Sequence, residues 1–213
     1  MSAIDNLAFT GLVGITFSVA KDSYAKRWVE TQGFSYVERE PAVVASGICG
    51  ENLTWSLTSD GVLTLDGTGS MATYTGEANI PWYANRNLIT TVNIGAGVTK
   101  LTTNAFCGCT NLETVNFAEN SSLLMIGGAA FKNCTSLKTI TLPEGLTTIS
   151  GNAFKYCRNL SSVYLPDTIS YIDELAFNGL SDVTFSVTKG GYAERWAVAH
   201  GFTYVERENA QGA

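Results

Sequence analysis

Apolar residues recur at a fixed spacing through the second half of the chain. An Ala-Phe pair is repeated, and its phenylalanines are Phe106, Phe131, Phe154 and Phe177, so that successive position numbers differ by 25, 23 and 23. Each of the first three is followed by the pattern Leu-x-x-Val/Ile-x-Phe/Leu, as in Leu137 to Leu142. Apolar residues at alternating positions are typical of a strand with one buried face. The pattern therefore predicts one short strand after each phenylalanine.

A single repeat reads Pro-x-x-Leu-x-x-Ile-x-x-x-Ala-Phe-x-x-Cys-x-x-Leu-x-x-Ile-x-Leu. A single unit cannot bury its apolar side chains by itself, whereas stacked copies share one continuous core. The repeat length lies within the roughly 20–29 residues of leucine-rich repeats. We predict a β-rich leucine-rich-repeat solenoid wound as a right-handed superhelix, with short strands and few short helices.

The segments beside the repeats predict two caps. Asp60-Gly61 between alternating segments favours a β-hairpin of residues 54–59 and 62–65, and Gly67 to Ser70 is expected to end it. The first strand of the array is expected at 89–94. At the other end, residues 192–200 predict a helix that Gly201 terminates, with Tyr192, Trp196 and Ala199 facing the last repeat. A last strand is expected at 202–205.

The chain also contains a longer duplication. Residues 4–40 match residues 172–208 without a gap at 23 of 37 positions, an offset of 168. We interpret this as a tandem unit of a larger parent, in which Met1 occupies the position of Ile169. The expected organisation is a terminal repeat and cap of a preceding unit at 1–40, a β-hairpin cap at 41–88, the repeat array at 89–187, and a helix-and-strand cap with a tail at 188–213.

Three motifs together resemble those of the BspA-type leucine-rich-repeat surface proteins of bacteria. They are the Ala-Phe-x-x-Cys-x-x-Leu repeats, the opening Gly-x-Cys-Gly-x-Asn-Leu-Thr-Trp from Gly47 to Trp55, and the closing Tyr-Ala-x-Arg-Trp, which occurs from Tyr24 and again from Tyr192. The resemblance implies an extracellular or cell-surface location and a non-enzymatic role in adhesion or protein–protein binding. It also implies unidentified partners among host or bacterial surface proteins or glycans.

Charge and hydropathy narrow the range of partners. The formal net charge is -6, and an acidic surface repels phosphate backbones, so no nucleic acid is expected to bind. No apolar run approaches the roughly 20 residues that cross a bilayer, so membrane insertion is not expected. Residues 1–40 are expected to expose Leu7, Phe9 and Phe17, which suggests self-association through this segment.

The five cysteines offer little chemistry. Cys109, Cys134 and Cys157 each stand three residues after a repeat phenylalanine, a position that leucine fills in Leu12 and Leu180. Such a position favours buried, inert thiols, and a ladder of disulfides or metal ligands is the alternative. The state of Cys49 and Cys107 is left open. We predict no metal and no cofactor.

No catalytic constellation emerges from the polar residues. His200 is the only histidine, and its counterpart in the duplicated copy is Gln32. Glu144 and Asp167 occupy matching turns and would stack at about 5 Å, although acids in turns are usually solvated. We therefore predict no enzymatic activity and assign no catalytic residue.

The exposed side of the stacked strands is the candidate binding surface, because solenoids use such extended faces to bind partners. Tyr164 stands out on it, since aromatic side chains often carry interface energy. An inert polar strand face is the alternative interpretation, and a purely structural spacer or stalk is the alternative function. The candidate residues are Thr90, Asn93, Thr114, Asn116, Thr139, Thr141, Ser162, Tyr164 and Asp182.

Overall fold

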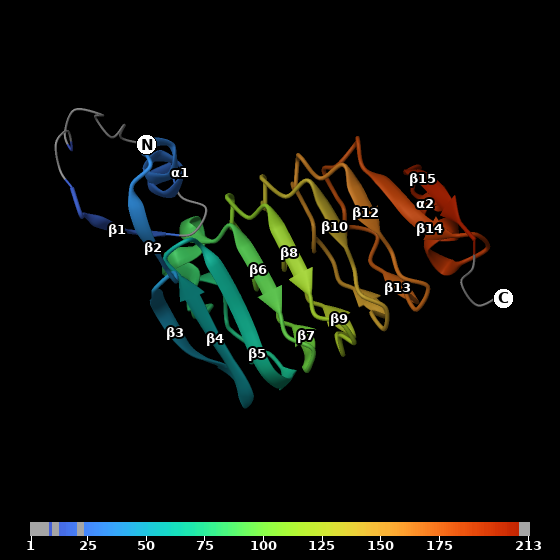
Figure 1. Ribbon diagram of the computed structural model, residues 1–213. Coiled ribbons are helices and arrows are strands. Elements are labelled where there is room, and N and C mark those ends of the chain that lie inside the picture. The colour runs from blue at the N-terminus through green and yellow to red at the C-terminus, as the bar shows by residue number, and fades with distance from the viewer. Residues whose placement is uncertain (1–8, 10–12, 21–23, 209–213) are drawn as a thin grey trace. The chain divides into compact units, whose positions relative to one another are not determined.

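The repeats form two rows of short parallel strands in the computed structural model, which describes residues 9, 13–20 and 24–208. The chain divides into two compact units, Met1–Val43 and Val44–Ala213. The repeats belong to the second unit (Figure 1). Each repeat contributes one strand to each row, so the chain coils around a shared core.

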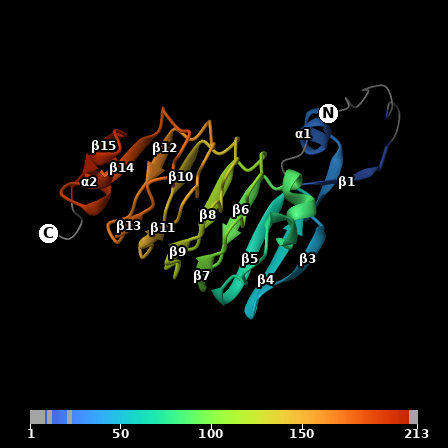
Figure 2. The same ribbon diagram turned by 180° about the vertical axis from the view of Figure 1, so that it is seen from behind.

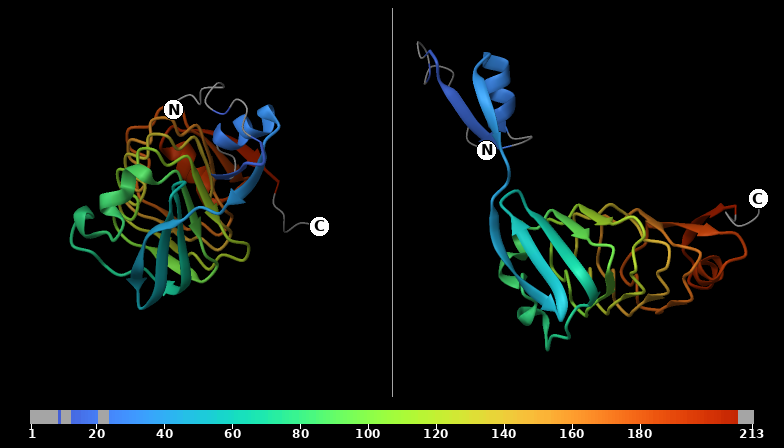
Figure 3. Two further views of the ribbon diagram at one scale, coloured as in Figure 1. Left: turned by 60° about the vertical axis from the view of Figure 1, so that its left-hand side comes forward. Right: turned by 60° about the horizontal axis from the view of Figure 1, so that its bottom comes forward.

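We call the two rows the long-strand row and the short-strand row. The long-strand row comprises β6 (Thr91–Ile94), β8 (Thr114–Phe117), β10 (Thr139–Thr141), β12 (Ser162–Tyr164) and β14 (Thr184–Thr188). The short-strand row comprises β7 (Val98–Leu101), β9 (Met125–Ile126), β11 (Thr148–Ile149) and β13 (Tyr171–Ile172). Figure 2 shows the second row from behind, and the right-hand view of Figure 3 shows the successive coils.

The long-strand row corresponds to the strands that the alternating pattern predicts, whereas the short-strand row was missed. Its strands are only two residues long from β9 onward, with one buried residue each, as in Ile126 and Ile149. Alternation cannot be read from two residues. They are strands because their backbone pairs with equivalent residues of the neighbouring coils, for example Ile126 with Ile149.

Both rows start from one long strand. β4 (Asn52–Thr58) and β5 (Val62–Ser70) form the predicted antiparallel hairpin at Asp60-Gly61, and β3 (Val43–Gly50) adds an unpredicted strand beside β4. Residues Val62–Leu65 of β5 pair with β6, and Gly69 and Ser70 pair with β7. The expectation that Gly67–Ser70 ends the strand is therefore wrong. β5 changes partner from the long-strand row to the short-strand row between Leu65 and Gly69, and its pairing with β7 has a register shift between Gly69 and Ser70.

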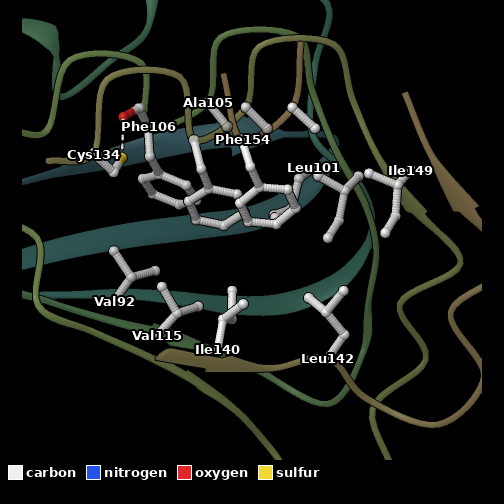
Figure 4. Close-up of a cluster of buried hydrophobic side chains, with 14 of the residues drawn as sticks. Val92, Leu101, Ala105, Phe106, Val115, Cys134, Ile140, Leu142, Ile149 and Phe154 are labelled. Atoms are coloured by element: carbon white, nitrogen blue, oxygen red, sulfur yellow. Dashed lines mark hydrogen bonds between the residues drawn. The ribbon is translucent and has the colours of Figure 1, made fainter. Parts of the chain in front are cut away.

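A column of stacked aromatic rings runs between the rows. The ring centroids of Phe106, Phe131, Phe154 and Phe177 are separated by 5.3, 5.2 and 5.0 Å in turn. Figure 4 shows this column between branched aliphatic side chains of the two rows, such as Ile140 on one side and Ile149 on the other. Because every repeat places a phenylalanine at the same core position, the regular spacing of these residues along the sequence gives a regular stack of rings in the core.

Different aromatic residues continue the column at its two ends. At one end, Trp82 stacks on Phe106 at 5.5 Å and Trp55 lies 5.5 Å from Trp82. Trp82 precedes the 3₁₀ helix η2 (Tyr83–Leu88), and η1 (Glu77–Asn79) lies just before it. Because η2 runs to Leu88, the first strand of the row begins at Thr91 and not at residue 89.

At the other end lie α2 (Tyr192–Ala199) and β15 (Thr203–Arg207). The helix buries Ala193, Trp196 and Ala197, whereas Ala199 is exposed. The predicted helix face is therefore wrong at Ala199. The face is centred on the large Trp196 ring, and Ala193 and Ala197, which precede and follow it, fit below the last repeat because they are small.

The first unit repeats this local structure. β1 (Thr16–Ala20), α1 (Tyr24–Gln32) and β2 (Ser35–Arg39) have the order of β14, α2 and β15, and both strand pairs are parallel. Thr16 pairs with Ser35 as Thr184 pairs with Thr203, which reproduces the offset of the duplication. The two copies of the duplicated segment therefore share the pairing register of their strands as well as their sequence.

The aromatic residues of the first unit pack against one another. Phe17 lies 5.2 Å from Phe9 and 6.0 Å from the largely buried Trp28. Phe9 and Phe17 are each partly buried in this cluster, and Leu7 lies outside the described residues. Self-association through residues 1–40 stays a prediction.

Candidate binding surface

The outward side chains of the long-strand row form two parallel lines, which the strand registers define. Thr91 is aligned with Thr114, and Thr139 with Ser162 and Thr184, in the first line. The second line aligns Asn93 with Asn116, and Thr141 with Tyr164 and Ser186. Side chains between them, such as Val92 and Val163, point into the core and are fully buried.

Seven of the nine predicted binding residues lie on these lines. Thr114, Thr139 and Ser162 belong to the first, and Asn93, Asn116, Thr141 and Tyr164 to the second. Thr90 precedes β6, and its hydroxyl lies 3.4 Å from the carbonyl oxygen of Gly61 in the hairpin turn. Asp182 lies in a bend before β14 and accepts a hydrogen bond from the hydroxyl of Ser181 at 2.9 Å.

The structure brings Asn93 and Asn116 together directly. The side-chain amide of Asn116 donates to the side-chain oxygen of Asn93 at 2.9 Å. This bond leaves the other amide hydrogens and oxygen lone pairs of the pair available. The two asparagines therefore present both donors and acceptors at one place on the row.

Tyr164 is held in place by a residue that the sequence did not indicate. The guanidinium carbon of Arg207, on β15, lies 3.7 Å from the centre of the Tyr164 ring. The same guanidinium donates to the carbonyl oxygens of Ser186 at 2.7 Å and Leu165 at 2.9 Å, and it pairs with Asp167 at 3.2 Å. One face of the ring is therefore covered, and Tyr164 is half-buried rather than fully exposed.

The hydroxyl of Tyr164 also has a partner. It donates to a carboxylate oxygen of Glu144 at 3.0 Å. Desolvation raises the pKa of Tyr164, and the hydrogen bond to Glu144 adds to this. Glu144 and Asp167, which the repeat pattern placed in matching turns, thus engage Tyr164 and Arg207 respectively.

The long-strand row is interrupted between β8 and β10. Within the described part of the chain, β8 pairs only with β6, and β10 pairs only with β12, although the short-strand row continues from β9 to β11. An open cavity of about 640 Å³ occupies the interruption. We call it the β8–β10 groove. Its lining residues are Glu113, Thr114, Val115, Asn116, Phe117, Ala118, Glu119, Asn120, Ser121, Thr139, Ile140, Thr141, Pro143 and Glu144.

The sequence contained a signal for this groove that was not used. The step from Phe106 to Phe131 is longer by two residues than each of the two steps that follow it. The two additional residues lie after β8, because Phe117 and Leu123 are six positions apart, whereas Leu142 and Leu146 are four apart. A longer step in an otherwise constant repeat marks a local change in the coil.

The cysteines are all buried and free. Burial was predicted for Cys109, Cys134 and Cys157 and is confirmed, at 1%, 0% and 0% exposure. The thiol of Cys134 donates to the carbonyl oxygen of Phe106 at 3.2 Å (Figure 4), and that of Cys157 donates to the carbonyl oxygen of Phe131 at 2.9 Å. Desolvation raises the pKa of Cys109 to about 12 and that of Cys49 to about 11.

The thiols are therefore expected to react slowly in the folded chain. Because the thiolate is the reactive form, a raised pKa lowers reactivity at about pH 8 and restores it only as the pH approaches the raised value. With Ellman's reagent, the native chain should show almost no reaction over the time in which the urea-unfolded chain exposes all five thiols. Rapid reaction of a native thiol would contradict this burial.

The remaining polar candidates do not converge. A ring nitrogen of His200 lies 2.7 Å from the carbonyl oxygen of Trp196, and the two rings stack at 4.4 Å. This places the histidine at the end of α2, apart from Glu144 on the groove. Among the residues that the structure describes, no group of three or more His, Cys, Asp or Glu side chains could hold a metal ion. Nor does any described helix have the length and apolar character needed to cross a membrane.

Comparison with known proteins identifies the family. The model of the BspA-type leucine-rich repeat region matches residues 79–190 with six copies of the repeat, which is more than half of the chain. The protein belongs to this family, as its Ala-Phe-x-x-Cys-x-x-Leu repeats predicted. No curated protein matches the chain.

Several solved structures are similar to parts of the chain. A leucine-rich repeat protein from Eubacterium ventriosum is 28% identical, with a TM-score of 0.47, over 61% of this chain and 40% of its own. One from Bacteroides ovatus is 25% identical, with a TM-score of 0.49, over 57% and 31%. A leucine-rich cell surface protein from Faecalibacterium prausnitzii is 25% identical, with a TM-score of 0.39, over 68% and 49%. The chain thus spans less than half the length of each.

Proposed function

We propose that this chain is a non-enzymatic protein-binding or adhesion module of a bacterial surface or secreted protein. The observation that carries the proposal is the long-strand row, whose outward side chains are polar, aligned in two lines and largely exposed over β8, β10 and β12. Membership in the BspA-type family supports a surface location and a binding role. The proposed partners are surface proteins or glycans of a host or of bacteria.

The row has the features of a recognition surface. Solenoids present extended faces on a core that makes each strand rigid. Here fully buried side chains such as Val163 anchor each strand from below. Arg207 fixes the Tyr164 ring, so little rotamer entropy is lost when a partner contacts its edge. The row therefore combines a preorganised aromatic side chain with hydrogen-bonding threonines, serines and asparagines.

A pair of matched variants tests this surface. Tyr164→Ala with Ser162→Glu changes the long-strand row, and Tyr171→Ala with Ser170→Glu makes the same change beside the short-strand row. Surface plasmon resonance against a panel of extracellular-matrix proteins and glycans should show saturable binding. We expect the first variant to weaken it about tenfold, since a central aromatic side chain often carries this much. The second should bind like the parent.

The outcomes separate the proposal from its rivals. If the Tyr164 and Ser162 variant still binds and the Tyr171 and Ser170 variant does not, the binding site lies on the short-strand row. Absence of binding in both variants and in the parent, with all three folded, would favour a spacer or stalk. The duplication fits that second function, because it repeats the β–α–β segment of one unit in the next with the same strand register.

We further propose that the two ends of the array are caps and that its coil is right-handed. The hairpin of β4 and β5 with Trp82 would cover the first coil, and α2 with β15 would cover the last. A right-handed coil follows the strong preference of connections between parallel strands of one sheet. We retain the division into 1–40, 41–88, 89–187 and 188–213 as the functional organisation of the chain.

A further inference from the structure

We propose that the β8–β10 groove binds a long basic side chain, preferentially arginine, that an extended segment of a protein partner presents. This inference rests on the proposed function, because it specifies the partner of the same strand row. It is carried by three features of the groove, namely its unpaired strand edges, its apolar floor and its acidic rim. The first of these features follows from the two additional residues after β8.

We attribute the missing pairing of β8 with β10 to the two additional residues after β8, and not to Pro143 alone. The N–H of Ala118 donates to the carbonyl oxygen of Ile94 at 3.0 Å and extends the pairing of β8 with β6. Pro143 occupies the corresponding position after β10 and has no N–H to donate. Pro166 occupies it after β12, yet β12 still pairs with β10. The feature peculiar to the interruption is therefore the longer loop after β8.

The interruption leaves backbone groups without a partner strand. β8 and β10 face each other across the groove. On these facing edges, the backbone N–H and C=O groups are not paired with any described strand. The free carbonyl oxygens add hydrogen-bond acceptors to the groove. A guanidinium group carries five N–H donors and no acceptor, so it suits such an environment.

The floor of the groove is apolar. At the core position that Phe117 occupies, Ile94, Leu142 and Leu165 are buried to 1% exposure or less, whereas Phe117 is only half-buried. Val115 is 9% exposed, and Ile140 lies beside it in the lining. The partly exposed Phe117, with Val115 and Ile140 beside it in the lining, offers apolar contact to the methylene stem of an arginine. Phe117 is also an aromatic side chain in the lining, and aromatic rings attract cations.

The rim of the groove is acidic. Glu113, Glu119 and Glu144 line it and are exposed. None of the lining residues, all of which belong to the described part of the chain, is basic. One carboxylate, Glu144, is already oriented by the Tyr164 hydroxyl at 3.0 Å. An apolar floor below carboxylates complements a side chain with an apolar stem and a cationic end.

Peptide binding tests this assignment directly. The probe is a fluorescein-labelled peptide of sequence Thr-Val-Arg-Val-Thr, and its partner probe replaces the arginine with glutamine. Fluorescence anisotropy should show saturable binding of the arginine peptide to the full chain and much weaker binding of the glutamine peptide. Higher salt should weaken the first, since exposed carboxylates are screened.

Two groove variants and one matched control complete the test. Glu113→Gln, Glu119→Gln and Glu144→Gln together should weaken arginine-peptide binding about threefold to tenfold, the range expected when one guanidinium loses one or two exposed ion pairs. Replacing residues 118–122 with Pro-Glu-Gly, the loop that follows β10, should close the ladder and abolish binding. The control changes three exposed glutamates outside the groove lining, Glu51, Glu174 and Glu208, to glutamine. It should bind like the parent.

The results distinguish this inference from the broader proposal. Equal loss in the groove variant and the control would show unspecific charge attraction and overturn the inference. Retained binding in the loop replacement, or no binding of the arginine peptide, would also overturn it. The Tyr164 and Ser162 test measures a different set of ligands, and neither residue lines the groove. The Tyr164 hydroxyl does bond to Glu144 on the rim, so the loop replacement, which leaves both residues in place, decides the inference independently of that test. Circular dichroism and thermal unfolding verify that each variant is folded.

Discussion

Replacing Phe154 with alanine is expected to lower the free energy of unfolding by about 3–5 kcal/mol, the range for a large side chain removed from a packed core. Phe154 is fully buried between Phe131 at 5.2 Å and Phe177 at 5.0 Å, with interplanar angles of 9° and 3°. The cavity would interrupt the aromatic column at its centre. Neighbouring rings cannot collapse into it, because each is held by its own repeat.

Urea unfolding monitored by circular dichroism measures this loss. Leu124→Ala is the matched control, because Leu124 is 52% exposed and its truncation removes little buried surface. It should change the free energy of unfolding by less than about 1 kcal/mol. A similarly small effect of Phe154→Ala would contradict a rigid column and indicate that the coils can repack independently.

The second large effect is expected at Trp82, which completes a ladder of hydrogen bonds as well as the aromatic column. Inside the array, the N–H groups of Phe106, Phe131 and Phe154 donate to the alanine carbonyl of the next coil, as from Phe106 to Ala130 at 2.6 Å and from Phe131 to Ala153 at 2.8 Å. Ala105 belongs to the first of these coils. Its carbonyl oxygen accepts the indole N–H of Trp82 at 2.8 Å in place of a phenylalanine N–H.

Two substitutions separate these roles of Trp82. Trp82→Phe keeps a ring against Phe106 but leaves the buried carbonyl of Ala105 without its donor, which should cost about 1–3 kcal/mol. Trp82→Ala loses the ring as well and should cost about 3–5 kcal/mol. Both are measured by urea unfolding. If Trp82→Phe were as stable as the parent, the hydrogen bond would contribute nothing and the indole would act through packing alone.

The family and the main architecture could be predicted because several copies of the repeat carry the same pattern. Four phenylalanines, their flanking leucines and the strands that follow agree in position, so the prediction does not depend on any single site. The Asp60-Gly61 hairpin and α2 were also predicted, because turn and helix-end residues act locally.

Other features depended on neighbours that lie far away in the sequence. The two-residue strands such as β9 have too few positions for a pattern. Arg207 is separated from Asp167 by 40 residues, and nothing in its own segment indicates that it covers Tyr164. The end of β5 was misjudged because Gly67 to Ser70 was taken to end the strand, whereas β5 continues to Ser70 and changes partner from β6 to β7 after Leu65.

The repeat pattern was enough to assign most core and outward positions of the array, because burial in a solenoid follows the repeat period. Seven of the nine predicted binding residues accordingly lie on the two outward lines of the long-strand row. The division of that row between β8 and β10 is visible only in the folded chain. Whether β8 reaches β10 depends on where a two-residue insertion displaces the backbone, and the resulting groove exists only between coils.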